Sequence, residues 1–366
     1  MARKLRSDRW LFVATVALVC ASVVMVYSAS AVMALERFDQ PYLFLFKQAA
    51  WSALGLFFLG GLMHVDYRHY RQPVVVWTVF VAVTCALLAV LFGPEINGTR
   101  RWFGVAGIGV QPSELAKIAV IFFTAAFLET HLEHVNDLRR GLAPIALASA
   151  GLAALILLEP DFGTASVLLL TVAVMVFAAG VHWRYVAGLG VLMVPVLWVV
   201  IASAGYRSRR IMTFLDPWKD PLGDGFQIIQ SLLAVGTGGF TGRGLMGGTQ
   251  KLFFLPEPHT DFIYAVISEE LGMIGATLVL MAFLVIAWRG LLISTAAPDR
   301  FGAFLALGLT TMIVLQAMVN ISVVLGLLPT KGIPLPLLSA GGSSLLINLV
   351  AMGILLNVSQ HGTESA

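Results

Sequence analysis

Residues 255–272, LPEPHTDFIYAVISEELG, connect a polar, glycine-rich stretch to a long apolar segment. The stretch contains one histidine and four acids, which are His259, Glu257, Asp261, Glu269 and Glu270. Ionisable side chains at membrane depth are rare because burying them in lipid is costly, and those that occur usually serve a function. The sequence therefore predicts a membrane protein whose important polar groups lie where a loop enters a membrane helix.

The composition of the whole chain supports an integral membrane protein. Hydrophobic residues make up 58% of the 366 residues and charged residues only 12%, with a mean hydropathy of +0.88. A soluble domain has about 25% charged residues, so there is little room here for a separate soluble domain. The two cysteines, Cys20 and Cys85, lie in apolar runs, and we predict neither a disulfide nor a metal site from them.

About ten segments are long and apolar enough to cross a bilayer, for which a helix needs roughly 20 residues. They are predicted near residues 10–33, 43–64, 74–92, 113–129, 142–158, 162–180, 185–204, 262–288, 302–327 and 337–357. The basic N-terminus is similar to the start of a signal peptide, but the apolar run after it is long and no clear cleavage site closes it. The expected fold is all-α and polytopic, with a single transmembrane domain over residues 1–366.

The distribution of arginines in the short loops predicts that both termini are cytoplasmic. A long extracytoplasmic segment, residues 205–260, then separates the seventh and eighth spans. Within it, the apolar spacing of residues 225–235 predicts an amphipathic helix along the membrane interface. The glycine-rich residues 236–248 contain a G-x-G-x-x-G match, but no strand precedes it, so we reject a dinucleotide site.

Several cations fall on the predicted outer side, where the positive-inside pattern does not place them. Arg100 and Arg101 precede Trp102 in a short loop, a pattern typical of an interfacial aromatic belt or of a phosphate site. Lys331 lies in residues 328–344, where three prolines and three glycines interrupt an apolar stretch. Non-helical backbone at membrane depth must be buried in protein or line a wet cavity. A cationic outer face would suit an anionic ligand.

Two interpretations of Asp261 remain open from the residues alone. Thr260 or Asp261 could cap the eighth span through its free N–H groups, or Asp261 could be a functional intramembrane acid. Glu269 and Glu270 lie about two turns deeper, where we expect them to pair with cations and hold the bundle together. His259 is a candidate to orient Asp261.

Two further polar motifs open predicted spans. Glu114 and Lys117 are three residues apart at the start of the fourth span, and so share one face of the helix. They are either a neutralised pair that tolerates burial, or a site where Lys117 meets a phosphate. Glu159 and Asp161 flank Pro160 in the turn between spans five and six, where Asp161 is expected to cap the sixth span.

Taken together, these motifs resemble the SEDS family (shape, elongation, division and sporulation), the FtsW and RodA proteins. The matching motifs, in family order, lie at residues 97–102, 111–117, 159–164, 255–263, 269–272 and 334–344. The resemblance covers nearly the whole chain. The sequence Leu-Pro-Thr-Lys-Gly at 328–332 is more similar to the division branch than to the elongation branch, whereas Ala340 and Glu159 depart from the residues that many members have there.

The resemblance implies a peptidoglycan glycosyltransferase that polymerises lipid II at the outer face of the bacterial cytoplasmic membrane, at the division septum. It also implies a class B penicillin-binding protein, a transpeptidase, as partner, together with other division proteins and no nucleic acid. Carried over by motif, Asp261 is the essential acid, and Arg101, Glu114 and Lys117 line an outward cavity. No cofactor is evident, and a role for a divalent cation stays open.

The chemistry of lipid II predicts one inverting displacement, because an α-linked donor gives a β-linked product. Asp261 is then the expected base for the acceptor hydroxyl, and Arg101 and Lys117 are expected to stabilise the departing pyrophosphate. Two other functions remain: a lipid II flippase, and a scaffold in which Asp261 would be replaceable. The clustering of deep polar residues toward the predicted outer side favours the enzyme.

Overall fold

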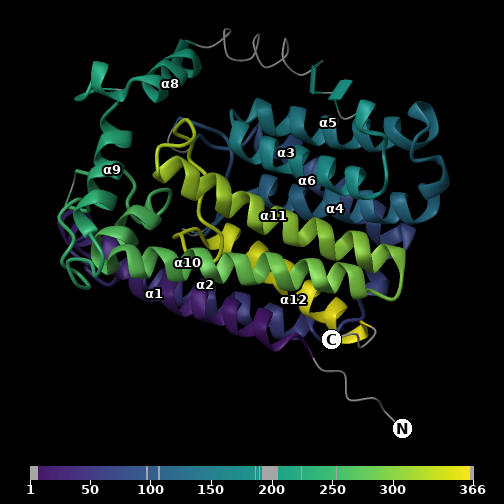
Figure 1. The fold of residues 1–366 in the computed structure, drawn as a ribbon, viewed down its shortest axis with the longest axis horizontal. Coiled ribbons are helices and arrows are strands. Elements are labelled where there is room, and N and C mark those ends of the chain that lie inside the picture. The colour runs from purple at the N-terminus through teal and green to yellow at the C-terminus, as the bar shows by residue number, and fades with distance from the viewer. Residues whose placement is uncertain are drawn as a thin grey trace.

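The structure is a computed structural model, and it describes residues 7–95, 98–105, 108–185, 187–188, 190–191, 205–223, 225–252 and 254–362. Nearly all the regular structure in these residues is helical, apart from one short hairpin (Figure 1). The α-helices are α1 (Arg9–Phe38), α2 (Leu43–Leu62), α3 (Pro73–Val90), α4 (Pro112–His131), α5 (Ala143–Leu158), α6 (Phe162–Ala178), α8 (Gly205–Leu215), α9 (Phe226–Gly238), α10 (Ile263–Ala296), α11 (Arg300–Val324) and α12 (Gly342–His361). Short helical turns are η1 (Tyr67–Arg71), η2 (Leu132–His134), η3 (Leu138–Leu142) and η4 (Pro217–Lys219), and the antiparallel hairpin pairs β1 (Phe103–Val105) with β2 (Ile108–Val110).

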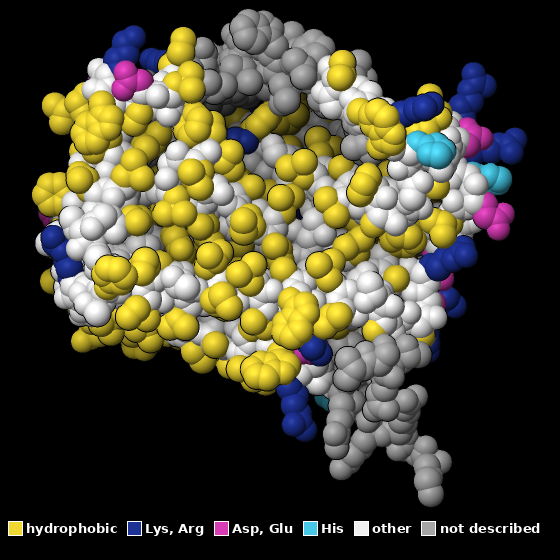
Figure 2. Space-filling view, in the orientation of Figure 1, with side chains coloured by type: hydrophobic (Ala, Val, Ile, Leu, Met, Phe, Trp, Pro, Cys, Tyr) yellow, Lys and Arg dark blue, Asp and Glu magenta, His cyan; other side chains and the backbone are white. Residues whose placement is uncertain are grey.

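The predicted all-α polytopic fold is confirmed, with nine of the predicted spans present as α1 to α6 and α10 to α12. In the part of the chain that the structure describes, 8 helices are long and apolar enough to cross a membrane, and α6 is a shorter apolar helix. The span predicted at 185–204 lies mostly outside the described residues. Apolar side chains cover most of the face in Figure 2, as expected of a surface that contacts lipid.

The helices run between two ends of the bundle, and both termini lie at the same end (Figure 1). The Asp8 N–H donates to Ser359 Oγ at 3.0 Å, and Arg289 Nη2 lies 2.6 Å from Asp8 Oδ2. These contacts join the start of α1 to the end of α12 and to the C-terminal part of α10. The position of both termini at one end is the arrangement that an even number of crossings would give. We call this the terminal end and the opposite one the loop end.

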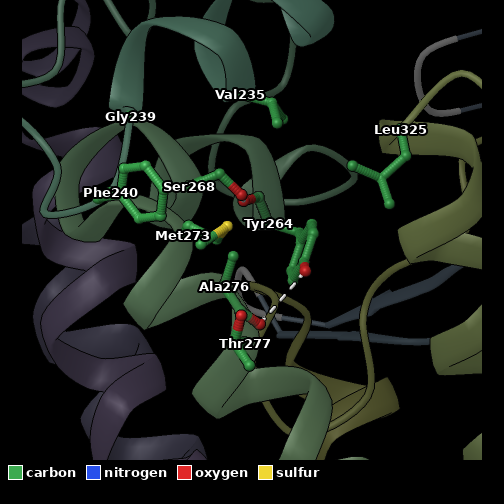
Figure 3. A pocket seen from close by; sticks show the side chains of 9 residues that line it. All are labelled: Val235, Gly239, Phe240, Tyr264, Ser268, Met273, Ala276, Thr277 and Leu325. Atoms are coloured by element: carbon green, nitrogen blue, oxygen red, sulfur yellow. Dashed lines mark hydrogen bonds between the residues drawn. The ribbon is translucent and has the colours of Figure 1, made fainter.

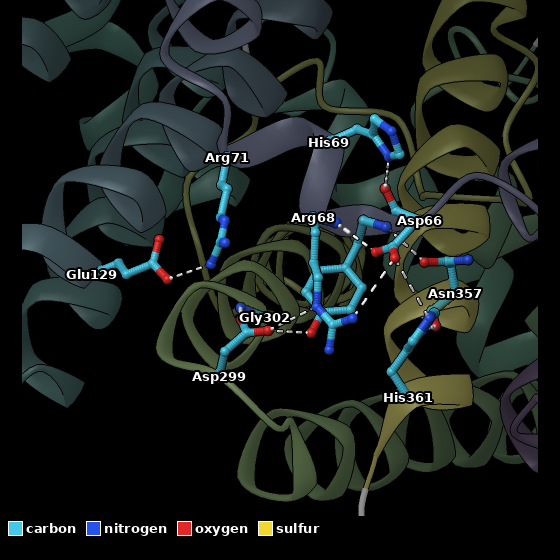
Figure 4. A network of polar contacts seen from close by, with 10 residues as sticks. Asp66, Arg68, His69, Arg71, Glu129, Asp299, Gly302, Asn357 and His361 are labelled. Atoms are coloured by element: carbon cyan, nitrogen blue, oxygen red, sulfur yellow. Dashed lines mark hydrogen bonds and ion pairs between the residues drawn. The ribbon is translucent and has the colours of Figure 1, made fainter.

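A polar network closes the terminal end (Figure 4). Asp299 caps α11 through Gly302 N at 2.7 Å, and also accepts from Tyr67 Oη at 2.5 Å. The Tyr67 N–H donates to Asn357 Oδ1 at 2.9 Å, and Asn357 Nδ2 donates to the Met63 carbonyl at 2.9 Å. The network therefore fixes η1 against α11 and α12, and it uses ordinary capping and backbone contacts.

The centre of the bundle is formed by α12 and α4. The apolar windows of these spans are 78% and 61% buried inside the protein, against 22% for α2 and for α3. Gly353 lets α12 approach α2 closely, since a Cβ there would lie 2.9 Å from Leu59 Cα. Small residues at helix contacts serve this purpose in membranes, where packing replaces the hydrophobic effect.

The long segment before α10 contains two α-helices where one was expected. The helix predicted at 225–235 is present as α9, but it buries Ile228, Ile229 and Ala234 against the bundle. Ser231 Oγ also donates to the Val324 carbonyl at 2.8 Å. The other helix, α8, is short and rich in arginine, and it was not predicted from the sequence.

The α10 helix is broken at Gly272, whose φ of +66° interrupts the helical backbone. Backbone groups on both sides of the break, which lack partners within α10, bond instead to the glycine-rich loop after α9. Met273 N donates to the Gly239 carbonyl at 2.8 Å, and Arg243 N donates to the Glu269 carbonyl at 3.0 Å. Gly242 is needed at this crossing, because a Cβ there would collide with the Glu270 carbonyl. The break and the loop thus satisfy each other's backbone groups.

The side chains of Glu269 and Glu270 are fully buried and accept hydrogen bonds from the same loop. Glu269 Oε1 accepts from Thr249 N at 2.8 Å, and Glu270 Oε2 accepts from Met246 N at 3.0 Å. Lys251 Nζ lies 2.5 Å from Glu270 Oε1. These contacts agree with the cation pairing and structural role expected of the two acids, and that role stays a prediction until the side chains are changed.

Replacing Gly272 by Ala should lower the thermal stability of the purified protein. The backbone of Gly272, at φ +66° and ψ −164°, is essentially restricted to glycine and costs another residue about 1–3 kcal/mol. The new Cβ would also lie 2.6 Å from the Phe240 carbonyl oxygen. The control is Gly151→Ala in α5, where a Cβ meets no heavy atom within 4 Å. Melting followed in detergent should drop for the first variant only. Equal melting temperatures would contradict this account of the break.

Candidate functional site

At the loop end, two segments meet around Asp261. The first is the turn that leads into α10, and the second is the stretch between α11 and α12 that contains the prolines and glycines. Asn320 Nδ2, on α11, joins them by donating to the Asp261 carbonyl at 2.8 Å and to the Ile333 carbonyl at 2.7 Å. Ser339 Oγ donates to the Thr260 carbonyl at 2.5 Å. The non-helical backbone here is therefore bonded within the protein, as its depth requires.

The carboxylate of Asp261 does not cap α10. Phe262 is the N-cap residue and makes no side-chain cap bond, while Thr260 Oγ1 turns back to the Glu257 carbonyl at 3.3 Å. The predicted cap is therefore wrong for both residues. Across the described residues, no hydrogen bond or ion pair reaches the Asp261 carboxylate. It lies against Gly332, where an added Cβ would be 2.8 Å from Asp261 Oδ2.

The surroundings of Asp261 favour its protonated form. Burial, aided by the nearby charges of Glu257 and Asp161 and opposed by Arg210, raises the pKa of Asp261 to about 7. A carboxyl with a pKa near neutrality can take a proton from a hydroxyl and release it again at physiological pH. The geometry and the charge balance thus both suit a general base.

Lys331 lies beside the same site. Its Nζ is 3.8 Å from the centre of the Phe162 ring, at the start of α6. Burial lowers the pKa of Lys331 to about 8, while Asp161 raises it and Arg210 lowers it. Lys331 is therefore a cation near Asp261, held by an aromatic face and by no ion pair within the described residues.

Asp161 caps α6, as predicted, and both of its carboxylate oxygens accept hydrogen bonds. Oδ1 accepts from Thr164 N at 3.0 Å, and Oδ2 accepts from Thr164 Oγ1 at 2.8 Å and from Gln111 Nε2 at 3.0 Å. Because Gln111 directly precedes α4, this bond fixes the start of α4 against the start of α6. Asp161 adds a fixed negative charge near both Asp261 and Lys331.

Arg101 holds the turn between α5 and α6. Its Nε donates to the Glu159 carbonyl at 2.5 Å, and its Nη2 donates to the Pro160 carbonyl at 2.8 Å. Pro160 has a φ of +32°, so the turn is strained and gains from these bonds. The structure thus places Arg101 on backbone oxygens, where it shapes the edge of the site.

Glu114 and Lys117 form a buried pair, with each residue 2% exposed. Lys117 Nζ lies 3.1 Å from Glu114 Oε2 and donates to Gln316 Oε1 at 2.6 Å. Gln316 Nε2 in turn donates to the Pro334 carbonyl at 3.0 Å. The structure thus has the neutralised pair, one of the two alternatives given for these residues. Through Gln316, the pair is connected to Pro334 in the segment that follows Lys331.

His259 does not orient Asp261 in this structure. Its ring centre lies 4.8 Å from that of Phe44, the second residue of α2, with the two ring planes tilted by 58°. Its Nδ1 has no hydrogen-bond partner among the described residues. Burial is the largest influence on the pKa of His259 and lowers it, with Glu257 opposing and Arg37 reinforcing the effect. Its carbonyl accepts from Ala340 N at 2.9 Å, which ties the turn to the second segment.

A cavity of about 390 Å³ lies between α9, the break in α10 and the end of α11, and it is separate from Asp261 (Figure 3). Its lining is mostly apolar, with Tyr264, Ser268 and Thr277 as polar members. The Tyr264 hydroxyl spans the break by donating to the Ala276 carbonyl at 3.2 Å. None of the residues predicted for the site lines this cavity.

Comparison with known proteins places the chain in a family. A family model described as cell cycle protein, covering FtsW, RodA and SpoVE, matches residues 9–364. The chain belongs to the FtsW, RodA and SpoVE family. Stage V sporulation protein E of Bacillus subtilis is 44% identical over 98% of both chains. A protein of a Geobacter species named probable peptidoglycan glycosyltransferase FtsW is 45% identical over 96% of both chains.

Solved structures of this family have the same fold. A chain from a study of how a peptidoglycan synthase complex coordinates polymerization and crosslinking matches with a TM-score of 0.81 and 32% identity, over 99% of this chain and 100% of that one. RodA of Thermus thermophilus matches with a TM-score of 0.71 and 27% identity, over 99% of both chains. The expected FtsW and RodA fold is therefore confirmed over nearly the full length.

Replacing Glu159 by Gln should stabilise this family member at alkaline pH. Glu159 is 1% exposed, and neither carboxyl oxygen has a hydrogen-bond partner among the described residues. Burial, aided by Asp161 and opposed by Arg101, raises the pKa of Glu159 to about 8 from 4.5. The folded state therefore keeps a proton that the unfolded state loses, so stability falls as pH rises between these two values.

The amide of Gln carries no such penalty. The melting temperature of Glu159→Gln, followed in detergent, should match that of the unchanged protein near pH 5, exceed it by an amount that grows up to about pH 8, and keep that difference above it. Glu95→Gln, at an exposed acid of the loop end, should follow the unchanged protein at every pH. A difference in melting temperature between Glu159→Gln and the unchanged protein that does not grow with pH would contradict the assignment of Glu159 as a buried, neutral carboxyl.

Proposed function

We propose that this protein is a peptidoglycan glycosyltransferase that polymerises lipid II into glycan strands at the outer face of the bacterial cytoplasmic membrane. The observation that carries the proposal is the Asp261 carboxylate at the loop end, which is half-buried, does not cap α10 and packs against Gly332, the residue after Lys331. The names of relatives at 43–45% identity over nearly the full length support it. Such a group is suited to take up and release a proton.

The proposed reaction is one inverting displacement. The acceptor 4-hydroxyl attacks the anomeric carbon of the donor sugar, and its proton passes to Asp261. The bond from that carbon to the diphosphate oxygen breaks, and the electron pair leaves with the polyprenyl diphosphate. A carboxylate without other hydrogen bonds keeps its oxygens available to the hydroxyl, and its pKa of about 7 keeps much of it ionised at neutral pH.

The roles of the other predicted residues follow from their contacts. Lys331 is the predicted cation whose chain neighbour, Gly332, packs against Asp261, and we assign Lys331 to the departing diphosphate. Arg101 and Lys117, predicted for the same task, are engaged by backbone carbonyls and by a buried pair. We assign Arg101, Glu114 and Lys117 to holding the walls of the site, and His259 to packing the turn against α2.

The proposed setting is the division septum, with a class B penicillin-binding protein as partner to crosslink the new strand. The match to a chain of a peptidoglycan synthase complex supports such a partner. The identity of 45% to a protein named FtsW supports the division branch. No resident cofactor is part of the proposal, and a divalent cation would enter with the diphosphate oxygens, which suit such an ion.

Replacing Asp261 by Asn should abolish glycan polymerisation by the purified protein with its partner, because the amide cannot accept the hydroxyl proton. Lipid II consumption and glycan length on gels measure the effect. Asp216→Asn is the matched control, since Asp216 is an exposed acid of the same long segment. Normal glycan from Asp261→Asn would overturn the base assignment. Absence of polymer from the unchanged protein in detergent would favour the flippase.

The rate of polymerisation should rise with pH through about 7, as Asp261 loses its proton. Glu257 raises the pKa of Asp261, so Glu257→Gln should lower that pKa and move the rise to lower pH. Thr260→Val is the control, because it removes the hydrogen bond to Glu257 without removing a charge and should leave the midpoint in place. A midpoint that Glu257→Gln leaves unmoved would contradict this electrostatic coupling.

A further inference from the structure

The helix α8 brings an arginine to the segment that contains Lys331. Arg210 Nη1 donates to the Thr330 carbonyl at 3.4 Å, although 120 residues separate the two in the chain. The backbone of α8 is thus placed so that a side chain from the long segment reaches the site. This hydrogen bond joins α8 to the segment between α11 and α12.

Three consecutive residues then connect Arg210 to the proposed base. The Thr330 carbonyl accepts from Arg210, Lys331 Nζ lies over the Phe162 ring, and Gly332 packs against Asp261 Oδ2. Neighbouring residues of an extended chain lie about 3.8 Å apart at Cα. Two cations from two different elements therefore lie on a short path that ends at the Asp261 carboxylate.

A guanidinium has five N–H donors, so Arg210 can bond the Thr330 carbonyl and also offer donors to an anion. A donor–acceptor distance of 3.4 Å is beyond the usual range of 2.7–3.2 Å, and the acceptor is neutral. A phosphate oxygen would offer a shorter, charge-assisted bond, for which the planar guanidinium is well suited. Arg101 differs, because its bonds to two carbonyls are 2.5 and 2.8 Å.

The position of α8 also suits a ligand with a lipid tail. Met212 and Leu215 are 68% and 71% exposed on this helix, close to Arg209 and Arg210. Exposed apolar residues beside arginines are typical of a helix that lies at a membrane interface. A polyprenyl diphosphate has its charged group at that same depth, with its chain in the lipid.

We propose that Arg210 of α8 is a second cation of the leaving-group site, which together with Lys331 binds the diphosphate released when the glycosidic bond to the donor lipid breaks. This inference rests on the proposed function, and it names the residues that bind the diphosphate leaving group of that reaction. When the bond breaks, the electron pair moves to the diphosphate oxygen, and the two cations stabilise that charge. The acceptor proton goes to Asp261, so charge and atoms balance.

The test compares two adjacent arginines of one helix. Arg210→Gln and Arg209→Gln each remove one positive charge from α8, and both side chains are exposed. The measurements are the rate of lipid II polymerisation by the full chain with its partner, and inhibition of that rate by inorganic pyrophosphate. Melting temperatures of the purified variants show that both are folded.

Arg210→Gln should slow polymerisation and weaken inhibition by pyrophosphate by roughly ten- to a hundredfold, the range for a lost hydrogen bond to a charged group. Arg209→Gln should change either quantity little, and Arg210→Lys should fall between. Equal behaviour of the two Gln variants, or undiminished inhibition in Arg210→Gln, would overturn the assignment of Arg210. Those results would leave the polymerase function standing, whereas no polymer from the unchanged protein would remove the proposed function itself.

Discussion

Backbone groups that leave a helix at membrane depth must find partners inside the protein, because lipid offers none. The loop end of this bundle depends on that constraint. Glu269 and Glu270 receive the N–H groups of the glycine-rich loop, and Asn320 and Ser339 bind the turn that carries Asp261. With these bonds in place, the non-helical segments around the site have a defined position, and the acid can stay open to a ligand.

The buried charges of the chain fall into two groups with different consequences. Glu114 with Lys117, and Glu270 with Lys251, are close pairs in which each charge compensates the other. Breaking such a pair leaves an uncompensated charge, so these residues are sensitive to mutation without touching a substrate. Asp261 is different, because its neighbours shift its pKa without bonding its oxygens. Sensitivity to mutation alone would not separate the two groups, whereas a shifted pH profile does.

Much of the fold could be predicted from the sequence, because the bilayer requires long apolar helices and these are visible as apolar runs. The break at Gly272 was missed, since a single glycine in an apolar run gives no sign that the backbone turns to φ +66° there. Residues 225–235 were predicted as a helix, but the amphipathic pattern is the same whether the apolar face meets lipid or protein. In α9 much of that face meets α10 and α11.

Apolar length and motif order are properties of the chain, so nine of the predicted spans, the family and the position of Asp261 at the start of a span could be predicted from the sequence. Only the tertiary structure decided which cations are engaged. Arg101 and Lys117 looked available in the sequence, yet carbonyls and acids from other helices occupy them. Arg210 is visible in the sequence as one of several cations of the long outer segment, but its bond to Thr330, the residue before Lys331, comes from the packing of segments 120 residues apart. Partners of that kind are set by where helices meet in space.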